Sequence, residues 1–133
     1  MAIDLGGWKT RGGAGEHGRA QVHAVDLRER RRVHAAAQQR IIEIAGQLKA
    51  KNANVFIEIE GHTDSLESEA RSLELSTLRA AQVKDELIRR GIDPIRLESI
   101  GMGQSEPIAT NSTEEGRALN QRIDLIITSY KNE

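Results

Sequence analysis

Residues 57–83 read IEIEGHTDSLESEARSLELSTLRAAQV, and this stretch decides the fold. Its first four residues alternate isoleucine with glutamate, which is typical of a strand with one buried face. Residues 61–64 (GHTD) leave that strand, and a polar loop over 65–71 follows. A second apolar pattern then recurs every three or four residues and predicts an amphipathic helix of about five turns. The positions that carry this pattern are Leu73, Ser76, Ala80, Val83 and Leu87.

On the N-terminal side the same alternation of helix and strand continues. A helix is predicted from about Val33 to residues 51–54, and a weak strand is predicted at 22–27 (VHAVDL). The apolar positions with helical spacing in that helix are Ala37, Ile41, Ile44, Ala45 and Leu48.

Three further elements are predicted beyond Gly91, which suits the left-handed residue after a helix. They are a short strand over 97–100, a short helix opened by the capping-box spacing of residues 112–115 (STEE), and a final strand over 123–127. Strands that alternate with helices indicate an α/β (α+β) fold of the βαβαβ type. We expect the helices to pack on one mixed sheet whose first strand is atypical or missing.

Composition divides the 133 residues into two unlike parts. The net charge of −1 combines +3 over residues 1–34 with −4 over residues 35–133. We therefore predict an irregular, flexible arm over 1–34 and one folded domain over 35–133. The basic run at 28–32 (RERRR) has no aromatic neighbours, so we interpret it as a solvated segment and do not predict a nucleic-acid partner.

Several classes of protein are excluded by what the sequence lacks. There is no cysteine, which excludes a disulfide scaffold, a thiol nucleophile and a cysteine-based zinc site. No run approaches the ~18 apolar residues of a membrane span. The chain has no nucleophile elbow, zinc-protease motif or glycine-rich phosphate loop, so we do not expect an enzyme.

The polar residues at the end of the first long strand are the candidate site. Asp64 lies where ligands bind in open sheets, outside the carboxyl end of a strand. Arg79 shares a helix face with Ser72 two turns earlier. His62 with Asp64 could suggest a metal pair, but the other three histidines lie within residues 1–34, so we predict neither a metal nor a cofactor.

Together these motifs resemble the C-terminal peptidoglycan-binding domain of the outer membrane protein A family, which includes the peptidoglycan-associated lipoprotein and the flagellar motor stator protein B. The signature is a hydrophobic strand, GHTD at 61–64, and then L-S-x-x-R-A-x-x-V at 75–83. The later matches are 91–94 (GIDP), 96–97 (RL), 101–103 (GMG), 107–109 (PIA), 111–113 (NST), 115–118 (EGRA) and 120–123 (NQRI). The likeness covers roughly residues 35–129.

The resemblance implies a ligand and the residues that hold it. The ligand is the diaminopimelate of the peptidoglycan stem peptide, whose ammonium would bind Asp64 and whose carboxylate would bind Arg79. The other implied site residues are Asn120, Arg122, Thr63 and Ser72. The implied function is non-catalytic anchoring of an envelope protein to the cell wall, in the periplasm of a Gram-negative-type bacterium, with a homodimer as one form of the protein. A protein-interaction or oligomerisation module without wall binding is the alternative.

The sequence departs from the family pattern in four places. Glu67 stands where glycine is frequent, Ser72 stands where asparagine is frequent, and Gln121 replaces the first arginine of an N-R-R motif. The Gln121 replacement removes a cation near the implied ligand. Residues 25–34 also match nothing at the start of the family pattern, and a shifted reading frame upstream of Ala35 is one hypothesis that explains this.

Overall fold

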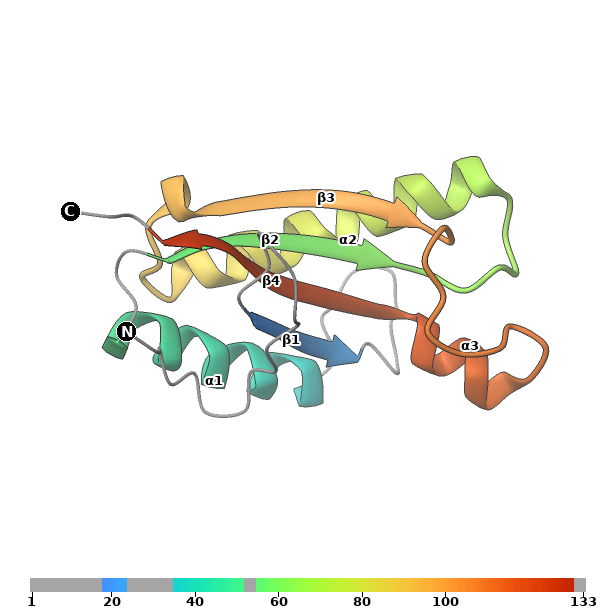
Figure 1. The fold of residues 1–133 in the computed structure, drawn as a ribbon, viewed down its shortest axis with the longest axis horizontal. Helices are drawn as coiled ribbons and strands as arrows, with labels where there is room; N and C mark the ends of the chain where they lie inside the picture. The colour runs from blue at the N-terminus through green and yellow to red at the C-terminus, as the bar shows by residue number, and fades with distance from the viewer. Residues whose placement is uncertain (1–17, 24–34, 52–54, 131–133) are drawn as a thin grey trace.

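A computed structural model of the chain describes residues 18–23, 35–51 and 55–130. Strands and helices alternate along it, with a 3₁₀ turn (η1) before the third strand (Figure 1). The elements are β1 (Gly18–His23), α1 (Ala35–Lys51), β2 (Val55–His62), α2 (Glu69–Arg89), η1 (Pro94–Arg96), β3 (Leu97–Gly103), α3 (Glu114–Asn120) and β4 (Arg122–Tyr130).

The four described strands form one mixed sheet in the order β1-β4-β2-β3. β4 is antiparallel to both β1 and β2, whereas β2 and β3 are parallel. The parallel pair requires a crossover, and α2 supplies it. As Figure 1 shows, the carboxyl ends of β2 and β3, the start of α2 and the whole of α3 lie at the same end of the sheet. This arrangement confirms the predicted α/β (α+β) class.

One apolar core lies between α1, α2 and the face of the sheet that they cover. It is aliphatic, and it contains Ile41, Ile44, Ala45 and Leu48 of α1 together with the alternating apolar residues predicted in β2 and β4. The burial of Ala37 lies outside the described residues. Its buried members are Ile41, Ile44, Ala45, Leu48, Ile57, Ile59, Ala80, Val83, Leu87, Ile92, Leu97, Ile123, Leu125 and Ile127.

Helix α2 lies unusually close to the two strands it connects. A Cβ atom added at Gly61 of β2 would clash with the backbone carbonyl of Ser76, and one added at Gly101 of β3 would clash with Thr77. The hydroxyl of Ser76 accepts a hydrogen bond from the backbone N–H of Gly103 at 2.9 Å. Two strand glycines and a small polar residue on the helix therefore fix the height of α2 above the sheet.

The strand predicted at 22–27 is observed four residues earlier. Residues 18–21, which lie in the predicted arm before that strand, belong to β1, whose backbone pairs with β4 from Gly18–Ile127 to His23–Arg122. An edge strand is held mainly by its main-chain ladder, so poor alternation of side chains did not exclude it. The first strand is thus present, and the rest of the predicted arm lies outside the described residues. The domain boundary at 35 stays a prediction.

The ends of α2 and α3 differ in detail from the prediction. α2 begins at Glu69, so its N-cap is Ser68, which accepts from the N–H of Arg71 at 3.2 Å, and Ser72 lies inside the helix. The N-cap of α3 is Thr113, one residue later than the capping-box spacing of 112–115 implies. Gly91 has φ +97°, as predicted for the residue that ends α2.

Leu73 was predicted to be in the core and is half exposed. Its side chain retains 51% of its accessible surface, whereas Ser72 and Ser76 beside it are buried. Leu73 approaches Gly103 through its backbone N and Cα atoms, while its side chain stays half exposed.

We expect Gly61→Ala to destabilise the protein by roughly 1–3 kcal/mol, because α2 must move away from β2 to admit the methyl group. Gly46→Ala in α1 is the matched control, since nothing lies within 4 Å of its added Cβ. That change should raise the free energy of unfolding by about 0.5–1 kcal/mol. Urea unfolding of the three proteins measures both effects, and equal stabilities for wild type and Gly61→Ala would refute the close approach.

Candidate functional site

The loop that follows β2 holds Asp64 in a fixed position. The N–H of Thr63 donates to the carbonyl of Gly103 at 2.9 Å, which ties the loop to the end of β3. The Thr63 hydroxyl donates to the Asp64 carbonyl at 2.9 Å, and Oδ1 of Asp64 accepts from the N–H of Leu66 at 3.0 Å. Asp64 is 6% exposed, so its carboxylate is oriented by the backbone rather than free in solvent.

Asp64 and Arg79 are brought together by a residue from a third element. Nε2 of Gln121 donates to Oδ2 of Asp64 at 2.6 Å, and Nη1 of Arg79 donates to Oε1 of Gln121 at 3.0 Å. The carboxylate comes from the β2–α2 loop, the guanidinium from α2 and the carboxamide from the junction of α3 and β4. One carboxamide therefore spans the distance between an anion and a cation, both of them buried.

Burial places the charge of Arg79 in an unfavourable environment. Desolvation lowers the pKa of Arg79 to about 10, and the nearby charges of Asp64 and Glu67 counter this only in part. The guanidinium remains protonated near neutral pH. An anionic group placed against Arg79 would favour its charged form further.

Thr63 and Ser72 lie near this site, and each is hydrogen-bonded to a residue at or next to the end of β3. The hydroxyl of Ser72 accepts from Nε2 of Gln104 at 3.2 Å, and Gln104 also donates to the carbonyl of Glu67 at 3.0 Å. Ser72 is 1% exposed. Through Gln104 it is connected to Glu67, so it supports the loop that carries Asp64 and Glu67.

Asn120 is used to hold a loop. Its Oδ1 accepts from the N–H groups of Ile108 and Ala109 at 2.7 and 3.0 Å. Its Nδ2 donates to the Ala109 carbonyl at 3.0 Å and to Oδ1 of Asn111 at 2.8 Å. These bonds use both groups of a side chain that is fully buried. Contact of Asn120 with a ligand stays a prediction.

Arg122 likewise binds neighbours within the protein. Its Nε lies 3.1 and 3.3 Å from the two carboxylate oxygens of Asp124, and its Nη2 donates to the carbonyl of Glu106 at 3.0 Å. The structure thus brings Asp64 and Arg79 together, and it directs Arg122 to Asp124. A ligand contact by Arg122 is not tested by this arrangement and stays a prediction.

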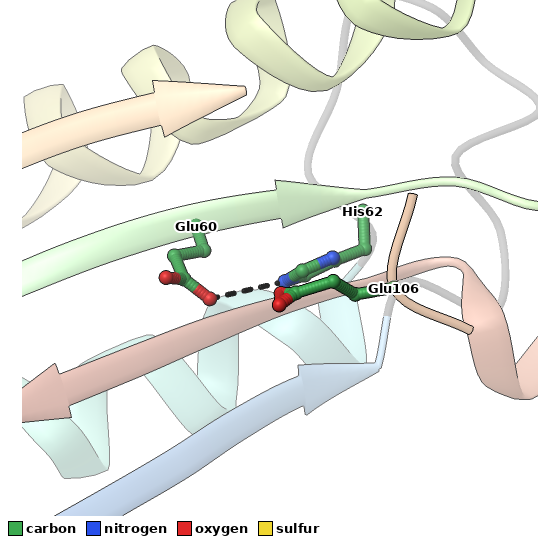
Figure 2. Close-up of side chains that lie close together, drawn as sticks. All are labelled: Glu60, His62 and Glu106. Atoms are coloured by element: carbon green, nitrogen blue, oxygen red, sulfur yellow. Dashed lines mark hydrogen bonds and ion pairs between the residues drawn. The ribbon is translucent and has the colours of Figure 1, made fainter. Parts of the chain in front are cut away.

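A second group of polar side chains lies on the sheet face opposite the core (Figure 2). Glu60 and His62 project from β2 and Glu106 from the loop after β3, and their ligand-type atoms lie within 4.8 Å of one another. Nε2 of His62 is 3.3 Å from Oε1 of Glu60 and 3.5 Å from Oδ2 of Asp124. This is the donor set, among the described residues, that could be considered for a metal ion.

The second ring nitrogen of His62, Nδ1, is buried. Among the described residues, Nδ1 of His62 has no hydrogen-bond partner although the ring is 1% exposed. Nε2 of the same ring lies near Glu60 and Asp124, so the described contacts form a polar cluster of Glu60, His62 and Asp124.

Glu58, on the same face of the sheet, makes the free energy of unfolding depend on pH. A hydrogen bond with Glu60, burial, and the charges of Glu60, Glu98 and Glu106 raise the pKa of Glu58 from 4.5 to about 7. The folded protein therefore binds more protons than the unfolded chain between these values, and the free energy of unfolding falls as pH rises through that range.

We expect Glu58→Gln to flatten this fall, because glutamine keeps the shape and loses the titration. Thermal unfolding at pH 5 and pH 8 should show a smaller difference in Tm for Glu58→Gln than for wild type. Glu115→Gln, at an exposed position, is the control. An unchanged difference in Glu58→Gln would contradict the raised pKa of Glu58.

Gln121 is the site residue that sequence reasoning misjudged. The sequence showed it only as a lost arginine, whereas the structure places its side chain between Asp64 and Arg79. Its position next to Asn120 in the N-Q-R motif was the available signal, because that motif precedes the strand beside β2.

None of the helices in the described part of the chain combines the length and apolar character that crossing a membrane requires.

Comparison with known proteins identifies relatives of the chain. The OmpA family matches residues 28–121. Outer membrane protein A of Bordetella avium is 42% identical over 94 residues, which are 71% of this chain and 48% of that protein. The chain thus spans about half the length of this relative. The family match begins seven residues before Ala35, where our own motif match began.

Two solved structures share the fold. The periplasmic domain of Helicobacter pylori MotB (residues 90–256 of that protein) superposes with a TM-score of 0.76 at 23% identity and covers 94% of this chain and 84% of that one. The peptidoglycan-associated lipoprotein from Burkholderia pseudomallei gives a TM-score of 0.66 at 29% identity, covering 71% of this chain and 79% of that one.

Proposed function

Because this chain belongs to the OmpA family, we propose that it binds peptidoglycan and anchors an envelope protein to the cell wall. The family is non-catalytic, and one solved relative is named for its association with peptidoglycan. The observation that carries the proposal is the buried pair of Asp64 and Arg79, held at the two ends of a single carboxamide. A site of this kind is complementary to a small group that carries both charges.

The ligand group that we propose is the diaminopimelate of the stem peptide. Its free end has an ammonium and a carboxylate on the same carbon. Asp64 would accept hydrogen bonds from the ammonium, and Arg79 would donate to the carboxylate through the planar fork of its guanidinium. The low pKa of Arg79, caused by desolvation, supports an anionic partner at this position.

The other predicted residues divide into two roles in this proposal. Thr63 and Ser72 orient the loop that carries Asp64. Asn120 and Arg122 fix the chain on either side of Gln121. In this proposal they would lie beside the ligand site. This division is supported by their burial and by their bonds within the protein.

The place of action that we propose is the periplasmic side of the cell envelope. The relatives are an outer membrane protein, a lipoprotein and a periplasmic domain, so more than one form of attachment occurs among them. A homodimer stays a prediction, and light scattering of the purified chain tests it.

Asp64→Ala and Arg79→Ala should each weaken binding of a diaminopimelate-containing muropeptide by roughly 10- to 100-fold. The reason is that each loses a charge-assisted bond of ~1.5–3 kcal/mol. Isothermal titration calorimetry measures the affinity. The matched controls are Asp85→Ala and Arg89→Ala, exposed on α2, which should bind as wild type does. Unchanged affinity in both site variants would refute the site.

The finer assignment has its own test. A muropeptide with lysine in place of diaminopimelate lacks only the second carboxylate, so wild type should bind it more weakly. Arg79→Ala should bind the two peptides about equally. Equal affinity of wild type for both peptides would refute the diaminopimelate assignment, while binding to peptidoglycan would stand.

A further inference from the structure

Both polar groups of the Gln121 side chain are bonded inside the candidate site. Nε2 donates to the Asp64 carboxylate at 2.6 Å, and Oε1 accepts from Arg79 at 3.0 Å. A carboxamide N–H₂ presents donors as an ammonium does, and a carboxamide oxygen accepts as a carboxylate does. The two ends of Gln121 therefore reproduce, without charge, the two ends of the ligand group proposed above.

We propose that Gln121 is an internal substitute for the ligand, which occupies the Asp64–Arg79 site in the free protein and must be displaced for peptidoglycan to bind. Gln121 would then set the affinity of the site. The inference rests on the proposed function and adds a competitor that belongs to the protein itself.

The geometry allows this displacement. Gln121 is the C-cap residue of α3, and its backbone is held independently of its side chain by a hydrogen bond from its N–H to the carbonyl of Arg117 at 3.2 Å. The residue is only partly buried, whereas its neighbours Asn120 and Arg122 are 0% and 2% exposed. Rotation of one side chain toward solvent would therefore open the site and leave the main chain in place.

The chemistry also makes the substitute weaker than the ligand. In a hydrogen bond between an ion and a neutral amide, only one partner is charged. If a ligand ammonium bound Asp64 and a ligand carboxylate bound Arg79, both partners of each bond would be charged. In the free protein the bridge gives each of the two buried charges one hydrogen-bond partner. It also lowers the apparent affinity by the fraction of molecules in which the site is open.

Removing the side chain should consequently tighten binding. If the bridge is closed in about 90% of free molecules, Gln121→Ala binds a diaminopimelate-containing muropeptide about tenfold more tightly than wild type. Gln39→Ala, on the exposed face of α1, is the matched control and should bind as wild type does. Unchanged or weaker binding by a folded Gln121→Ala protein would overturn the inference, since a residue that contacts the ligand would give that result.

A second measurement uses the wild-type protein and does not depend on the variant folding. The side-chain amide of Gln121, assigned by nitrogen-15 NMR, should change its chemical shift and lose protection from exchange as the muropeptide saturates the site. An amide resonance that stays unchanged at saturation would show that the bridge persists, and would overturn the inference.

Asp64→Ala separates the two proposals. If wild type binds and Asp64→Ala does not, the proposed site stands, and the result for Gln121→Ala decides this inference alone. If neither wild type nor Gln121→Ala binds the muropeptide, the proposed function fails and the inference falls with it. If Gln121→Ala binds and wild type does not, the internal competitor is supported directly.

Discussion

The close contact between α2 and the parallel strands is the constraint on which the rest of the structure depends. Gly61 and Gly101 leave no room for a Cβ atom beneath Ser76 and Thr77, so the helix lies directly on the sheet backbone. Arg79 follows Ser76 by one turn. Its guanidinium is consequently held at a fixed height, where it is joined through Gln121 to Asp64 of the loop after β2.

This packing also explains how a small aliphatic domain tolerates many buried charges. Several of these charges lie beside a charged or hydrogen-bonding partner, because unpaired charges in such surroundings are strongly destabilising. On the face opposite the core, Arg122 is paired with Asp124, and His62 lies between Asp124 and Glu60. At the end of the sheet, a neutral carboxamide bridges Asp64 and Arg79. On our proposal, the neutral bridge can be replaced by a ligand. The ion pair of Arg122 and Asp124 stays in place.

The fold could largely be predicted from the sequence, because strict periodicity marks both long helices and the two central strands. β1 was predicted at the wrong position because an edge strand is defined by its backbone ladder to β4. The predicted burial of Leu73 was wrong, because the spacing of apolar residues along a helix does not show how closely its backbone approaches the sheet. Asp64 and Arg79 were selected from motif and position, but the role of Gln121 depends on three elements meeting in space, which spacing along the chain does not encode.

On this proposal, Asp64 and Arg79 hold the two charges of one ligand group in the place that Gln121 occupies in the free protein. A crystal structure of the complex with a diaminopimelate-containing muropeptide tests this most directly. We expect the ligand ammonium on the Asp64 carboxylate, the ligand carboxylate on the Arg79 guanidinium, and the Gln121 side chain turned away from both. A muropeptide bound elsewhere, with the Asp64–Gln121–Arg79 bridge intact, would contradict it.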